Sequence, residues 1–126
     1  MESLNIDRNI LQDLEAIEIS FRNELFDPSA VLCRTVVEKA TRKLYESSKK
    51  QRCPKNWGLD QLNDDLYNSK TYDRKIHAKV LGLLQQTNPI VHGEISDIGE
   101  SYLRIVIALA QDIIVDIYSI MPKQSP

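Results

Sequence analysis

The chain has 126 residues, a length that fits one domain and is enough to bury an ordinary hydrophobic core. Hydrophobic residues make up 42% of it and charged residues 27%, a balance that excludes a disordered chain. The formal net charge of −2 excludes the strongly basic surface that indiscriminate polyanion binding requires, although it leaves room for a local basic patch.

The sequence predicts an all-α protein, because long alternating β patterns are missing and glycine and proline are few. A first helix is expected from Asp7 to Asn23, where apolar residues recur at near-helical spacing. Asp27 and Pro28 then form a start signal, with Asp27 as the N-cap and Pro28 at the first helical position. The second helix is predicted from Pro28 to about Lys49.

A basic connector follows from Ser48 to Gly58 and ends beside Trp57. We interpret it as a solvated loop, the usual state of a charge run, while the alternative is a polyanion contact in which Trp57 stacks. A short helix is expected from Leu59 to Asn68. Thr71 is a candidate cap for a further helix that includes the segment from Ile76 to Leu84.

Two residues should shape the end of that fourth helix. Pro89 should end or bend it, because the residue before a proline disfavours the α region. Gly93 then permits a turn. Asp97, with Glu100 three residues later, resembles a capping box and predicts a last helix from Ile98 to Met121.

The last helix is apolar on nearly all sides, which predicts a place at the centre of the core or in a subunit interface. Arg104, Asp112 and Asp116 lie within it and argue against a membrane span. The polar tail from Pro122 to Pro126 is expected to be frayed.

The cysteines and the first residues indicate a cytoplasmic protein. Cys33 and Cys53 lie outside any CxxC pair, so we expect free thiols in a reducing compartment. The segment from Met1 to Asn5 lacks the charged and apolar regions of a secretion signal. Because the chain has no phosphate loop, HExxH or GxSxG motif, neither a metal nor a cofactor is expected.

Four residues are the candidate site. His92 is a candidate general acid or base, since its ordinary pKa is near neutral, or it is a structural residue at the turn. Asn88 holds a ligand or simply terminates the helix. Arg34 and Glu38 are four residues apart on one helix face. They form either a partly buried pair that orients His92 or an ordinary pair on the surface.

Three segments resemble a known family. The run from Pro28 through Arg34 and Glu38, the run from Gly58 to Leu62, and the Asn88-to-Gly93 run look like the bacterial domain-of-unknown-function family 4145. The resemblance covers roughly Asp27 to Tyr118. That family is similar to the HEPN superfamily, which implies an up-and-down bundle of four to five helices, usually dimeric, that often belongs to toxin–antitoxin and anti-phage systems.

The resemblance also implies where catalysis would lie. Active HEPN members are metal-independent endoribonucleases with an Arg, a polar residue and a His in one motif. Asn88 and His92 match the last two positions, but Thr87 stands in place of the Arg. A neutral hydroxyl cannot stabilise developing negative charge as a guanidinium does, unless Arg34 replaces it in space.

The function expected from these observations is a non-catalytic HEPN-like interaction module. It would dimerise through its last helix and act with partner proteins in a prokaryotic defence or toxin–antitoxin system. The alternative is a metal-independent endoribonuclease, with His92 as acid or base, Asn88 positioning phosphate and Arg34 stabilising charge. A weaker alternative is a nucleotide-binding pocket built from Arg34, Glu38, Asn88 and His92.

Overall fold

The structure, a computed structural model, describes residues 5–122 and contains five α-helices. Their bounds are α1 Arg8–Arg22, α2 Phe26–Lys49, α3 Leu59–Asn68, α4 Arg74–Val91 and α5 Glu100–Ile120. Over the described range the chain forms helices and no strands, which confirms the all-α prediction. Of the polar tail expected from Pro122 to Pro126, residues 123–126 lie outside this range.

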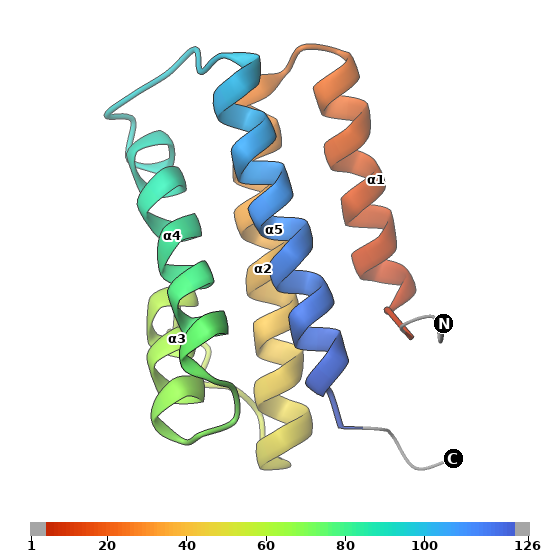
Figure 1. The fold of residues 1–126 in the computed structure, drawn as a ribbon, viewed down its shortest axis with the longest axis vertical. Helices are drawn as coiled ribbons and strands as arrows, with labels where there is room; N and C mark the ends of the chain where they lie inside the picture. The colour runs from red at the N-terminus through yellow and green to blue at the C-terminus, as the bar shows by residue number, and fades with distance from the viewer. Residues whose placement is uncertain (1–4, 123–126) are drawn as a thin grey trace.

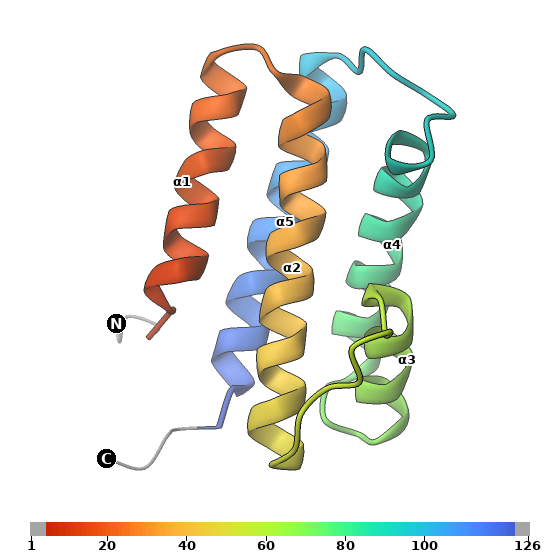
Figure 2. The same cartoon turned by 180° about the vertical axis from the view of Figure 1, so that it is seen from behind.

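Helix α2 is the central element of the bundle. It packs against each of the other four helices, whereas α1 packs mainly on α2 and meets α5 where the Arg104 guanidinium lies over the Phe21 ring. Figures 1 and 2 show that α1, α2, α4 and α5 run alternately up and down along one common direction. The short α3 lies beside the first half of α4, so the second half of α4 faces α2 without α3 between them.

The core is built from the buried aliphatic faces of all five helices. Helix α2 contributes two alanines, two valines, a leucine and Cys33, each fully buried, which lets neighbouring helices approach it from several sides. Helix α5 contributes the largest aliphatic face, made of Leu103, Val106, Ile113, Ile114 and Ile117. Burying such side chains contributes roughly 1.5–3 kcal/mol each before chain entropy is counted.

The start of α2 differs from the expectation. The helix begins at Phe26 with Leu25 as its N-cap, so Asp27 is not the cap. The two carboxylate oxygens of Asp27 instead accept hydrogen bonds from the backbone N–H groups of Asp97 and Ile98, at 2.9 and 3.0 Å. An early turn of α2 therefore holds the loop that joins α4 to α5.

Two other predicted caps are also wrong. Asp73, not Thr71, caps α4, because its side chain accepts a hydrogen bond from the backbone N–H of Ile76 at 3.0 Å. Gly99, not Asp97, is the N-cap of α5, which begins at Glu100. Asp97 has a left-handed backbone (φ 55°), and its N–H donates one of the two hydrogen bonds that Asp27 accepts.

Pro89 lies inside α4 and does not end it. The helix continues to Val91 and ends through backbone bonds from Gly93 to Ile90 and from Glu94 to Pro89, at 3.1 and 2.8 Å. These two bonds are the Schellman pattern of a helix C-terminus, in which the residue after the cap is left-handed. Gly93 takes that role with φ 72°, as the turn prediction required.

Helix α5 has a buried face and an exposed face, although its sequence is apolar nearly all round. Its exposed face, the outer stripe, consists of Ser101, Arg104, Ile105, Ala108, Gln111, Asp112, Val115 and Ser119. Ile105 is 61% exposed and Val115 is 46% exposed, so the bundle leaves both side chains largely uncovered. No helix within residues 5–122 has the length and apolar character needed to cross a membrane.

Candidate functional site

Arg34 and Asn88 meet across the α2–α4 contact. The Arg34 guanidinium donates a hydrogen bond from Nη1 to the side-chain oxygen of Asn88, and the contact is partly buried. Arg34 lies in the first half of α2 and Asn88 in the last turn of α4. The structure thus brings together two of the four residues that the sequence singled out, through a contact that neither local spacing predicted.

His92 lies at the end of α4, one turn beyond Asn88. It is the C-cap residue, it is exposed, and its backbone N–H donates to the carbonyl oxygen of Asn88 at 2.9 Å. Its place in the Schellman pattern matches the structural alternative, in which the residue belongs to the turn. A catalytic role for His92 would need reactive groups that a substrate or a second chain brings to this exposed end.

Thr87, at the position where the HEPN resemblance implies an arginine, is fully buried. Its hydroxyl donates to the carbonyl oxygen of Leu83 at 2.8 Å, a bond within α4. A guanidinium at this position would point into the aliphatic core rather than toward Asn88 and His92. The local environment therefore suits a small neutral side chain and not the charged residue of an active HEPN motif.

Glu38 does not pair with Arg34. Its carboxylate lies 3.6 Å from Nε of Arg42, which follows it by one helical turn, and both side chains are about one-third exposed. The expected Arg34–Glu38 pair is therefore wrong in its partners, while the expected partial burial of both residues is confirmed. Arg34 turns toward α4, whereas Glu38 turns toward the connector that follows α2.

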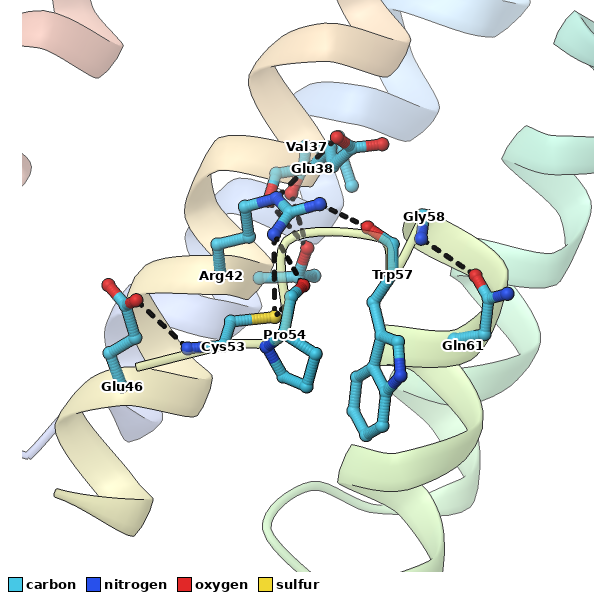
Figure 3. Close-up of polar contacts among 10 residues, drawn as sticks. Val37, Glu38, Arg42, Glu46, Cys53, Pro54, Trp57, Gly58 and Gln61 are labelled. Carbon is cyan, nitrogen blue, oxygen red and sulfur yellow. Dashed lines mark hydrogen bonds and ion pairs between the residues drawn. The ribbon is translucent and has the colours of Figure 1, made fainter. Parts of the chain in front are cut away.

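Arg42 is the residue that sequence reasoning missed. Figure 3 shows its guanidinium among the atoms of the connector, where Nη1 lies 3.4 Å from both Sγ of Cys53 and the carbonyl oxygen of Pro54. Nη2 donates to the carbonyl oxygen of Trp57. The sequence signal for Arg42 is its spacing of four residues from Glu38, the same spacing that separates Arg34 from Glu38 on the other side.

The connector is held to the bundle rather than solvated along its whole length. Besides Arg42, the Glu46 carboxylate accepts from the backbone N–H of Cys53 at 3.0 Å (Figure 3). The Trp57 ring packs edge-on against Tyr45, with ring centroids 5.7 Å apart. That packing occupies the indole on the α2 side, which argues against the alternative in which Trp57 serves as a stacking platform for a nucleic acid.

A hollow lined mainly by basic residues lies along the last three turns of α2. It measures about 590 Å³ and is lined by Lys39, Arg42, Lys43, Glu46, Ser47, Lys50 and Pro122. Two of its cations already contact carboxylates of the first helix and the residues before it: Lys39 contacts Asp13 at 2.8 Å, and Lys43 contacts Asp7. The hollow is consequently close to neutral and offers little attraction to a polyanion.

Neither cysteine suggests chemistry. Cys33 and Cys53 are both free thiols and both buried, as the sequence predicted for their redox state. Burial raises the pKa of the Cys33 thiol to about 12, which suppresses the nucleophilic thiolate. Within residues 5–122 no three His, Cys, Asp or Glu side chains come close enough to hold a metal ion.

Comparison with known proteins adds no further evidence on function. No family model matches the chain, and neither a curated protein nor a solved structure matches it.

Proposed function

We propose that this chain is a non-catalytic, HEPN-like helical module that forms a homodimer through α5 and acts with partner proteins. The setting proposed for it is a prokaryotic defence or toxin–antitoxin system. The outer stripe carries the proposal: Ile105 is the most exposed of the large apolar side chains in the described range, and it shares this stripe with Val115 and Ala108. Exposed aliphatic side chains on one helix face are typical of subunit contacts.

The surroundings of the motif support the non-catalytic part. Thr87 is buried and bonded within α4, and Arg34 is already bonded to Asn88. The motif therefore has no free guanidinium beside His92 on the same helix. An endoribonuclease that uses a ribose hydroxyl as nucleophile needs such a charge to stabilise its transition state.

The HEPN-like assignment draws support from the same contact. The resemblance is based on two spaced pairs, Arg34 with Glu38 and Asn88 with His92. The Arg34 and Asn88 side chains meet and His92 lies one turn away on α4, whereas Glu38 contacts Arg42 instead. An alternating arrangement of long helices agrees with the bundle that the resemblance implies.

The test is the mass of the protein in solution. Sedimentation velocity between about 1 and 100 micromolar should give a dimer that dissociates on dilution. The Ile105→Asp variant should be monomeric over that range, while Ile19→Asp should behave as wild type, because Ile19 is a similarly exposed residue of α1. A wild-type protein that stays monomeric throughout the range would overturn the proposed assembly.

A second candidate is the metal-independent endoribonuclease. The observation that favours it is the Arg34 guanidinium, which lies within hydrogen-bonding reach of Asn88 and thereby brings a positive charge to the motif. If this candidate is right, the purified protein cleaves RNA in EDTA and His92→Ala abolishes the cleavage. Intact RNA after prolonged incubation with the wild-type protein excludes it.

A further inference from the structure

We infer that the partner of α5 is the α5 of a second copy, packed antiparallel about a two-fold axis that passes beside Ala108. This inference rests on the proposed function, because it specifies how the proposed dimer is built. It follows from the order of charged and small side chains along the outer stripe.

Ala108 lies at the middle of the outer stripe. The buried residues Leu103, Val106, Ala110 and Ile117 define the opposite side of α5, so Ala108 points away from the bundle. Ser101 and Ser119 lie toward the two ends of the same stripe and are also small and exposed. Small residues on a helix face allow a second helix axis to approach to about 8 Å.

The charges of the stripe are arranged symmetrically about Ala108. Arg104 precedes it by four residues and Asp112 follows it by four, so each lies one turn away in opposite directions. A two-fold axis beside Ala108 relates the helix to a second copy that runs in the opposite direction. The level of Arg104 in one copy then coincides with the level of Asp112 in the other. Arg104 of each copy then faces Asp112 of the other, and the interface contains two reciprocal ion pairs.

Both charged side chains can reach a second copy. The Arg104 side chain is 63% exposed and that of Asp112 is 53% exposed. Within the chain the Arg104 guanidinium contacts Glu100 at 3.1 Å and lies over the Phe21 ring, 4.9 Å from its centroid, while Asp112 contacts Lys79 at 2.8 Å. Ion pairs near the surface contribute little to stability, so they can be shared with or exchanged for the pairs between copies.

The same pattern disfavours a parallel pair. In a parallel two-fold arrangement each residue faces its own copy, so Arg104 would oppose Arg104 and Asp112 would oppose Asp112. Like charges held face to face weaken an interface. The antiparallel arrangement also places Val115 opposite Ser101 of the second copy and Ile105 opposite the stem of Gln111, so the exposed aliphatic residues gain cover.

The experiment reverses each charge separately. The Arg104→Asp variant carries two acidic residues on its stripe and Asp112→Arg carries two basic ones, so each alone should dimerise at least about tenfold more weakly than wild type. An equimolar mixture should recover the affinity as a heterodimer, because every pair between the two variants is then complementary. The double variant on one chain should recover it as a homodimer.

Controls separate charge pairing from damage to the fold. Glu15→Arg, a charge reversal on an exposed position of α1, should dimerise like wild type. Circular dichroism and thermal unfolding verify that each variant is folded, and Arg104→Glu with Asp112→Lys repeat the test where a first variant unfolds. A monomeric wild type would refute the dimer itself. Two results with a dimeric wild type would refute only the antiparallel pairing. One is that both single charge reversals dimerise as tightly as wild type, and the other is that mixing the two variants does not restore the wild-type affinity.

Discussion

Arg34 on α2 and Asn88 on α4 are 54 positions apart in the chain and share a hydrogen bond that links the two helices. The bond joins the first half of α2 to the last turn of α4. It is partly buried, and a charged donor meets a neutral acceptor, so the guanidinium keeps contact with water while the amide orients it. Its main consequence in the free protein is to fix the second half of α4 on α2.

Removal of either partner should weaken the bundle. We expect Arg34→Ala and Asn88→Ala each to lower the free energy of unfolding by about 1–2 kcal/mol, the range for a charged hydrogen bond that water partly screens. The double variant should cost less than the sum, because both single changes break the same bond. Urea unfolding of the four proteins measures the coupling. Gln85→Ala, at an exposed position of α4, is the control, and strictly additive losses would contradict the contact.

An arginine introduced at position 87 should harm the fold rather than create an active site. Thr87 is fully buried, so Thr87→Arg should destabilise the protein by at least about 3 kcal/mol through an uncompensated buried charge. Thr87→Val has nearly the same shape, and its cost should stay within about 1 kcal/mol, because the lost bond lies inside α4. Thermal unfolding of both variants checks this. A stable Thr87→Arg protein would contradict the burial of the α4 face that carries Thr87.

The sequence could predict the helices better than their partners. Apolar spacing located all five helices, and the bounds Leu59 to Asn68 agree with those observed for α3. The sequence-based predictions were wrong where one polar side chain can bind several different groups. Asp27 has the chemistry of an N-cap, but it binds backbone groups 70 residues later, and no local pattern reveals such a partner.

The candidate site shows the same limit. Arg34 and Glu38 are spaced for a pair on one helix, yet the position of α4 decides that Arg34 bonds Asn88 instead. Glu38 is left to Arg42, whose role depends on the path of the connector from Cys53 to Trp57. Spacing on a helix indicates which residues share a face, but the packed neighbour selects which of them meet.

Asp27 should control the order of the α4–α5 loop. In Asp27→Ala the N–H groups of Asp97 and Ile98 lose their acceptors, so their amide hydrogens should exchange much faster. Asp27→Asn keeps one acceptor oxygen and should give an intermediate rate. The amide of His92, which donates to Asn88 within the end of α4, is the internal control. Equal acceleration at His92 would indicate general loosening and would contradict a local role.

Arg42 should protect the connector from proteolysis. Its guanidinium holds Pro54 and Trp57, and the connector contains the exposed residues Arg52 and Lys55, after which trypsin cleaves. Arg42→Ala should therefore be cut in the connector several times faster than wild type under native conditions, because the connector opens locally. Mass spectrometry identifies the cut sites. Arg74→Ala, at an exposed position of α4, should be cut at the wild-type rate. An unchanged rate of cleavage in Arg42→Ala would show that the Arg42 contacts do not hold the connector closed.

Alkaline pH should destabilise the fold in a way that Cys33 partly explains. Burial raises the pKa of its thiol from 9.0 to about 12 in the folded protein, so below pH 9 the thiol is protonated in both states. Between pH 9 and about 12 the unfolded chain releases this proton and the folded chain keeps it, which makes the free energy of unfolding fall as pH rises.

Other groups contribute in the same direction. Burial raises the pKa of Tyr118 to about 12 and also raises that of Tyr72, and hydrogen bonds to Asp112 and Asp116 raise that of Lys79. Cys33→Ala should therefore make the decline above pH 9 shallower without removing it. Urea unfolding at several pH values from 8 to about 11 measures the slope. Identical slopes in wild type and Cys33→Ala would show that the Cys33 thiol titrates alike in the folded and unfolded protein.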